Sequence, residues 1–196
     1  GSFRIITLGC KVNQYESACL EEQLKGEGWS RASKDDRADL VIINTCIVTQ
    51  RASYQSRQAI RKAIRENPGC TAAAVGCYGQ VFHQELAGIK GLNIVTGNAE
   101  KFSLLGILQD VPKGIQRYFI SNDFTKKGAF DCPPAKALPN RTRAYLKIQD
   151  GCDSFCTYCI VPFARGPIRS LEPSKVIEHL NILCEEGYKE AILTGI

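Results

Sequence analysis

Three cysteines, Cys152, Cys156 and Cys159, are spaced C-x3-C-x2-C, closer together than any other trio of cysteines in the chain. Cysteine thiolates are the usual ligands of iron–sulfur clusters, and thiolates at this spacing can reach three irons of one 4Fe-4S cube. No fourth cysteine follows in this stretch, so the spacing predicts a cluster with one iron open for chemistry. Zinc is the alternative, but structural zinc takes four ligands, and both histidines, His83 and His179, lie elsewhere in the sequence.

This stretch resembles the signature of the radical S-adenosylmethionine (SAM) enzymes, with Tyr158 as the aromatic residue before the last cysteine. The resemblance implies that SAM binds the open iron through its amino and carboxylate groups, with Tyr158 in the cofactor site. It also implies that an electron from the cluster cleaves SAM to methionine and a 5′-deoxyadenosyl radical. The spacing by itself indicates only a three-thiolate site on a loop after a strand.

The composition is that of an ordinary folded protein, with 44% apolar and 23% charged residues in 196. No apolar run approaches the length of a membrane span, and no segment has the pattern of a secretion signal. Ten cysteines without such a signal favour reduced thiols over disulfides. We therefore expect a cytoplasmic protein of one or two domains that does not enter the membrane.

Basic residues are concentrated between residues 111 and 147, where eight Lys or Arg stand against two Asp. This charge is compatible with a nucleic-acid contact and equally with a solvated linker. A second basic feature is the predicted helix 49–66, which carries a polar stripe. Its members are Arg51, Gln55, Gln58, Lys62 and Arg65. The stripe could meet phosphates, although a solvated outer face is the more common explanation.

The first 110 residues alternate between short apolar runs and helical patterns. Strands are predicted at 3–10, 39–46, 71–77 and 92–97. Helices are predicted at 14–27, 49–66, 79–87 and 98–108, the last with Asn98 as its N-cap. Strands that alternate with helices indicate an α/β fold with a doubly wound parallel sheet. We therefore predict one N-terminal domain over residues 3–110.

Three further cysteines, Cys10, Cys46 and Cys77, each stand at the C-terminal end of a predicted strand. These ends share one edge of a parallel sheet, and such sheets bind ligands there. The fold should therefore bring the three thiols together, at a second three-thiolate cluster site. Packing is the alternative explanation, because cysteine is also a common buried residue.

The sequences around these cysteines sharpen the prediction. Thr7-Leu-Gly-Cys-Lys-Val-Asn-Gln-Tyr-Glu-Ser17, Asn44-Thr-Cys46 and Val75-Gly-Cys77 resemble the N-terminal domain of the methylthiotransferase branch of radical SAM enzymes. The resemblance implies that Cys10, Cys46 and Cys77 hold an auxiliary 4Fe-4S cluster, which carries the sulfur to be transferred. The cofactors implied for the whole enzyme are two 4Fe-4S clusters and SAM, with an external electron donor such as flavodoxin.

Residues 111–140 have the composition of a linker, rich in Pro, Gly and Lys. A strand at 143–149, a helix at 173–186 and a strand at 189–193 then predict the start of a partial β/α barrel in residues 141–196. The resembled enzymes complete this barrel and add a TRAM RNA-binding domain. Neither part is in this sequence, so we expect the chain to be a piece of a longer protein.

Three substrate classes occur in this branch: isopentenyl-adenosine in tRNA, threonylcarbamoyl-adenosine in tRNA, and an aspartate of a ribosomal protein. Lys11 stands where the ribosomal-protein enzymes typically have proline, and Arg165-Gly-Pro differs from the Arg-Gly-Glu form of the isopentenyl group. The resemblance therefore favours insertion of a methylthio group at adenine C2 of N6-threonylcarbamoyladenosine, at position 37 next to the tRNA anticodon. The alternatives are the same reaction on isopentenyladenosine, and a non-catalytic iron–sulfur or zinc module that binds RNA.

Overall fold

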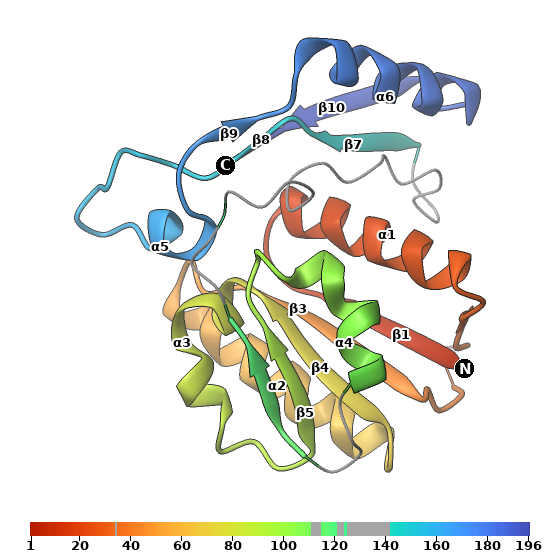
Figure 1. Cartoon of the computed structure of the whole chain (residues 1–196), viewed down its shortest axis with the longest axis vertical. Helices are drawn as coiled ribbons and strands as arrows, with labels where there is room; N and C mark the ends of the chain where they lie inside the picture. The colour runs from red at the N-terminus through yellow and green to blue at the C-terminus, as the bar shows by residue number, and fades with distance from the viewer. Residues whose placement is uncertain (34, 111–114, 121–123, 125–141) are drawn as a thin grey trace.

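The structure is a computed structural model, and it describes residues 1–33, 35–110, 115–120, 124 and 142–196. Most of the predicted linker, residues 111–140, therefore lies outside the described residues. The remainder consists of a large parallel sheet flanked by helices and, above it in Figure 1, a smaller unit that carries the C-terminal residues.

The large sheet has six parallel strands in the order β2-β1-β3-β4-β5-β6. They are β1 (Ser2–Thr7), β2 (Ser30–Arg31), β3 (Leu40–Thr45), β4 (Thr71–Gly76), β5 (Leu92–Thr96) and β6 (Arg117–Phe119). The four strands predicted from the sequence are the central ones, and the predicted α/β fold with a parallel sheet is confirmed. Two short strands extend the sheet at its edges, and β6 comes from the segment predicted as a linker.

Helices cover both faces of this sheet. They are α1 (Lys11–Gly26), α2 (Gln50–Glu66), α3 (Cys77–Leu86), the 3₁₀ helix η1 (Lys101–Ser103) and α4 (Leu104–Asp110). Successive side chains of a strand point to opposite faces. Val41 and Ile43 of β3 accordingly pack in one apolar cluster with α2 and α3. Leu40 and Ile42 pack in the other, with α1 and α4. Burial on both faces explains why β3 is apolar through its middle.

The smaller unit is built around two parallel strands joined by a crossover helix. It consists of β7 (Arg143–Lys147), β8 (Gln149–Asp150), α5 (Val161–Arg165), β9 (Arg169–Ser170), α6 (Pro173–Glu185) and β10 (Glu190–Thr194). β10 pairs with β7 in parallel, and α6 connects them. The short antiparallel pair β8–β9 holds the ends of the segment that contains Cys152, Cys156 and Cys159.

Helix α1 lies between the large sheet and the smaller unit (Figure 1). Leu20 and Leu24 pack towards the sheet. Tyr15 and Cys19 pack on the other side, in a third apolar cluster with Ala144 and Leu146 of β7 and Leu183 of α6. The two parts of the chain therefore share a continuous interior through α1.

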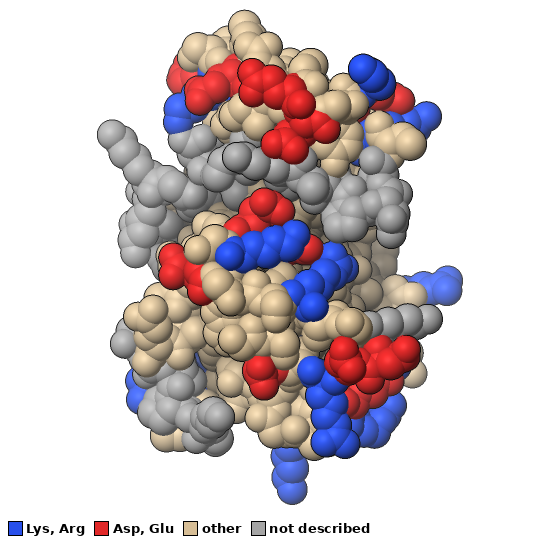
Figure 2. Space-filling view, turned by 90° about the vertical axis from the view of Figure 1, so that its right-hand side faces the viewer, with Lys and Arg blue, Asp and Glu red and all other residues tan. Residues whose placement is uncertain are grey.

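The outer surface is polar over much of one side. Figure 2 shows side chains of both signs over the lower part and a group of acidic side chains over the upper unit, which contains α6. Among the described residues, no helix combines the length and the apolar character that crossing a membrane requires.

Candidate functional site

Cys10, Cys46 and Cys77, here called the first cysteine set, lie at the C-terminal edge of the large sheet. The strands β1, β3 and β4 that precede them are neighbours in the sheet. Their C-terminal ends are in register, because Thr7 pairs with Asn44 and Thr45 pairs with Gly76. The chain turns directly after each strand, so the cysteines come from three adjacent turns. A Cβ atom placed on Gly9 would lie 2.8 Å from the Cys46 Sγ atom. The structure thus brings these three residues to one edge of the sheet, as expected.

Glycines shape two of these turns. Gly9 has φ +92° and precedes Cys10, which is the exposed N-cap residue of α1. Gly76 has φ +95° and precedes Cys77, the first residue of α3. A side chain is strained at such positive φ values, and a Cβ on Gly76 would also lie 2.6 Å from the Asn44 Oδ1 atom. Glycine therefore lets the chain turn tightly just before both cysteines.

Cys46 is held rigidly by one side chain. The Ser56 hydroxyl donates to the Cys46 carbonyl oxygen at 2.9 Å and accepts from the Cys46 N–H at 3.1 Å. Burial raises the pKa of the Cys46 thiol, and the neighbouring Cys77 and Cys10 raise it further because thiolates repel one another. A bound metal would instead hold the Cys46 side chain as a thiolate, because a thiol ligates a metal in its deprotonated form.

Asn98 was predicted as the N-cap of a helix, and that prediction is wrong. The residue before η1 is Glu100, whose side chain makes no capping bond. The Asn98 Nδ2 group instead donates to the Cys77 Sγ atom at 3.5 Å and to the Ala164 carbonyl oxygen in α5 at 2.6 Å. The chain after β5 runs beneath α5, so tertiary partners displace the local capping bond.

Cys152, Cys156 and Cys159, here called the second cysteine set, lie on the loop between β8 and α5. Gly151 opens this loop with φ +83°, and a Cβ there would lie 2.0 Å from the Pro167 carbonyl oxygen. The Cys152 N–H donates to the Gly166 carbonyl oxygen at 3.0 Å, and the Cys159 N–H to that of Cys156 at 2.9 Å. The loop is thus closed at its base while its cysteines are wholly or partly exposed.

Neither cysteine set has the geometry of a single-ion site. Within the described parts of the chain, no group of three or more Cys, His, Asp or Glu side chains could hold one metal ion. A 4Fe-4S cube attaches its cysteine ligands to different irons, so its ligands stand further apart than those of one ion. The three-cysteine donor sets fit such a cube by their chemistry.

Five buried ionic side chains, here called the buried ion cluster, lie between α1 and the second cysteine loop. They are Glu16, Lys101, Lys147, Asp150 and Arg165. Glu16 accepts hydrogen bonds from all three cations, at 2.9 Å from Lys147 and 2.8 Å from Arg165. Asp150 accepts from Lys147 and from Arg165 at 3.1 Å each. These residues come from α1, η1, β7, β8 and α5, so the cluster joins the two parts of the chain.

The electrostatics of the cluster follow from this arrangement. Burial alone would raise the pKa of Glu16, but Arg165, Lys101 and Lys147 outweigh burial and hold the pKa of the carboxyl well below its usual range. Burial lowers the pKa of Lys101, and Glu16 does not offset this fully because Arg165 stands nearby. Arg169 adds a further cation at the edge of the cluster, 3.6 Å from Asp150.

Comparison with known proteins identifies the relatives of the chain. Residues 2–97 match the profile of the uncharacterized protein family UPF0004. The chain is 41% identical over 190 residues to the threonylcarbamoyladenosine tRNA methylthiotransferase MtaB of Bacillus subtilis, covering 97% of this chain and 42% of that protein. It is 37% identical over 189 residues to the Aquifex aeolicus protein of the same name, covering 96% and 46%. Over nearly its whole length the chain is thus similar to proteins named as tRNA methylthiotransferases.

The chain is also similar to a protein with a different name. The tRNA-2-methylthio-N(6)-dimethylallyladenosine synthase of Christiangramia forsetii is 32% identical over 196 residues, covering 97% of this chain and 40% of that protein. The chain thus spans less than half the length of each of these methylthiotransferases.

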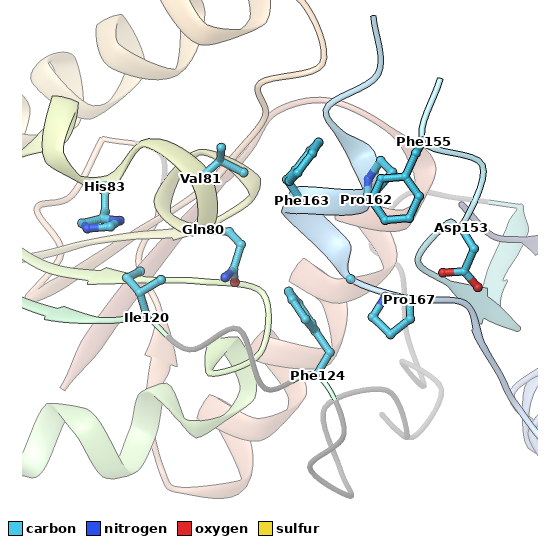
Figure 3. Close-up of a pocket in the computed structure, with 11 residues that line it drawn as sticks. Gln80, Val81, His83, Ile120, Phe124, Asp153, Phe155, Pro162, Phe163 and Pro167 are labelled. Atoms are coloured by element: carbon cyan, nitrogen blue, oxygen red, sulfur yellow. The ribbon is translucent and has the colours of Figure 1, made fainter. Parts of the chain in front are cut away.

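A cavity of about 550 Å³ lies where the UPF0004 part meets the second cysteine loop (Figure 3). Gln80 and His83 of α3 line one side, and Phe155 and Phe163 line the other. The two phenylalanine rings meet edge to face with centroids 6.0 Å apart. Tyr158, predicted for the cofactor site, is 91% exposed on the loop. Both cysteine-bearing parts of the chain thus contribute aromatic or polar walls to one cavity.

The buried ion cluster is not predicted by the sequence patterns, because each of its charged residues looks ordinary by itself. A signal was present in α1. Val12, Glu16 and Leu20 follow one another at intervals of four residues, so they share a helix face. A glutamate on an otherwise apolar face indicates a buried charge with a partner. The polar stripe of α2, in contrast, is exposed along its length, as a solvated outer face requires.

Proposed function

We propose that the protein containing this chain is a tRNA methylthiotransferase. It inserts a methylthio group at adenine C2 of N6-threonylcarbamoyladenosine, at position 37 next to the anticodon, by radical SAM chemistry. The observation that carries the proposal is a contact between the first cysteine set and the helix that follows the second set. Asn98 contacts Cys77 of the first set and Ala164, which lies in the helix just after the second set.

The two sets have different roles in this proposal. Cys152, Cys156 and Cys159 would hold the SAM-binding 4Fe-4S cluster, and Tyr158 would contribute to the SAM site. The first cysteine set holds the auxiliary 4Fe-4S cluster. When bound, these groups supply the radical that activates adenine C2 and the sulfur that is transferred. An external electron donor such as flavodoxin provides the reducing electron.

The chain's own residues position these sites. The glycines before Cys10 and Cys77 and the bonds of Ser56 fix the first set at the sheet edge. The β8–β9 pair and Gly151 close the loop of the second set. In this proposal residues 3–110 form the N-terminal domain, and residues 111–140 form a basic linker whose strand β6 extends the sheet of that domain. Residues 141–196 form the start of the radical SAM barrel, in which β7, α6 and β10 are the first strand–helix–strand unit.

The relatives support threonylcarbamoyladenosine as the substrate. Four proteins named for it are 41%, 37%, 32% and 31% identical to this chain, against 32% and 30% for two named for dimethylallyladenosine. The same reaction on isopentenyladenosine is the alternative substrate. A non-catalytic RNA-binding module is the other candidate, and two incomplete, three-cysteine ligand sets argue against it because each leaves an open iron.

Mass spectrometry of tRNA nucleosides tests the proposal. A strain that lacks the full-length protein should lose the methylthio form of threonylcarbamoyladenosine. The full-length gene should restore it, a Cys156→Ala variant should not, and a Cys184→Ala variant should, because Cys184 belongs to neither set. Loss of the methylthio form of isopentenyladenosine alone would establish the alternative substrate. Unchanged nucleosides would refute methylthiotransferase activity on both.

A further inference from the structure

The side chain of Asn98 has a fixed orientation at the junction of the two cysteine sets. Asn98 is 7% exposed, and its backbone N–H donates to the Gln80 Oε1 atom at 2.8 Å. A carbonyl oxygen can only accept, so the short 2.6 Å contact with Ala164 identifies the facing atom as the amide nitrogen. The same nitrogen lies 3.5 Å from the Cys77 sulfur. The amide hydrogens therefore point at a cysteine sulfur on one side and at α5 on the other.

Buried cations lie beside the same cysteine. Lys101, Lys147 and Arg165 are buried and pair with the carboxylates of Glu16 and Asp150. The Lys101 Nζ atom lies 3.5 Å from the position of a Cβ on Gly76, the residue before Cys77. Charges in a protein interior interact more strongly than charges in water. These cations would therefore favour negative charge on a group held by Cys77.

We propose that Asn98, together with the buried cations Lys101 and Arg165, sets the reduction potential of the cluster on the first cysteine set. Asn98 is a positioning residue in this proposal, because it acts through the Cys77 sulfur. The inference rests on the proposed function, since it requires a 4Fe-4S cluster on Cys10, Cys46 and Cys77. It adds a role for residues that bind neither cluster nor substrate.

The direction of the effect follows from electrostatics. Hydrogen bonds to the sulfurs and local charge are among the factors that tune the potential of such clusters. Reduction adds one electron, so a donor at the sulfur and nearby cations stabilise the reduced form more than the oxidised form. They therefore raise the reduction potential. Removing the donor should make the cluster harder to reduce.

The test uses the 196-residue chain with alanine at all three positions of the second set, reconstituted anaerobically with iron and sulfide. Any cluster must then sit on the first set. Dithionite with redox mediators supplies the electrons, and electron paramagnetic resonance measures the reduced fraction at each potential. Asn98→Ala deletes the amide, and Asn98→Leu deletes it while keeping most of its volume.

Asn67→Ala is the matched control. Asn67 is also buried, donates from Nδ2 to the Ala63 carbonyl oxygen at 2.8 Å, and accepts from the Ala38 N–H at 2.9 Å. It precedes β4, at the opposite edge of the sheet from the cysteines. Its loss should lower the melting temperature without changing the potential. If the reduction potential shifted equally in the Asn98 and Asn67 variants, the cause would be general destabilisation.

At a given potential, both Asn98 variants should show a ratio of reduced to oxidised cluster about tenfold lower than the parent chain. This corresponds to a reduction potential about 59 mV more negative for a one-electron couple. Potentials equal to that of Asn67→Ala would overturn the inference while leaving the cluster assignment standing. If Asn98→Ala does not fold, Asn98→Leu decides. Failure of the parent chain to assemble a cluster would instead refute the proposed first site, and the inference with it.

Discussion

Replacing Glu16 by glutamine should destabilise the chain far more than the same replacement at Glu21, although both residues lie on α1. Glu16 accepts hydrogen bonds from three buried cations. Glutamine preserves the size of the side chain but removes its charge. Lys101 would then have no ion-pair partner within the described residues, and its ammonium would face an amide in a water-free interior.

The magnitude follows from burial. Removing one partner of a buried ion pair costs about 3–5 kcal/mol, because the remaining charge is left uncompensated. Glu21 instead pairs with Lys25 and Arg31, whose side chains are 42% and 50% exposed. The Glu21 side chain is itself only 10% exposed, but its two cations reach solvent and stay hydrated when the carboxylate is neutralised. Pairs with solvent-exposed partners contribute about 0–1 kcal/mol. The expected difference between the variants is therefore about 3 kcal/mol, a large part of the roughly 5–15 kcal/mol that stabilises a typical domain.

Urea unfolding at pH 7, followed by circular dichroism, measures both free energies. Equal losses in the two variants, or a loss below about 1 kcal/mol for Glu16→Gln, would refute the assignment of the buried ion cluster as a structural joint. An unchanged urea dependence of the free energy, with only the midpoint shifted, would show that the variants unfold to the same state.

The same variant has a signature in acid. The cations hold the pKa of Glu16 below its usual range despite burial, so its carboxylate stabilises the fold above the unfolded pKa of about 4.3. That contribution is lost as the pH falls through the lower, folded pKa. The parent chain should therefore lose stability steadily below about pH 4.3, and Glu16→Gln should show a smaller loss over that range.

Three further outcomes are expected. Gly151→Ala should cost more stability than Gly187→Ala, since both residues have positive φ but only Gly151 also lacks room for a Cβ; equal melting temperatures would contradict the described loop closure. In the metal-free chain, iodoacetamide at pH 8 should modify the exposed Cys10 and Cys156 before Cys46, whose pKa burial raises; peptide mass spectrometry would reveal the reverse order. In the full-length protein, alanine at the second cysteine set should abolish reductive SAM cleavage, whereas alanine at the first set should stop only methylthio transfer. Equal loss of both activities in a folded first-set variant would refute this division of roles.

The sequence predicted the central sheet because β3 and β5 carry apolar runs, which are typical of strands that helices cover on both faces. It also predicted that the first cysteine set would gather at one edge, because parallel strands end together. The edge strands β2 and β6 were not predicted, since two or three residues carry no usable periodicity. The cluster-binding roles of all six cysteines stay predictions.

Long-range partners explain the other differences. Asn98 has a side chain that suits an N-cap, but its partners lie at Cys77 and Ala164, distant in sequence. The buried ion cluster likewise joins residues as far apart as Glu16 and Arg165. Sequence patterns report on neighbouring residues, so they predict hydrogen bonds within one element. They do not identify the partners of a polar residue that bonds to another element.

Helix α1 has a consequence for how the molecule folds. The UPF0004 match ends at residue 97, yet a chain cut there would expose Tyr15 and Cys19 to water and strip Glu16 of all three cations. The evolutionary module and the cooperative folding unit therefore have different boundaries. If recombination joined residues 2–97 to a different partner, that partner would have to cover the face of α1 on which β7 and α6 now pack. The UPF0004 part and the C-terminal unit are therefore expected to be inherited together.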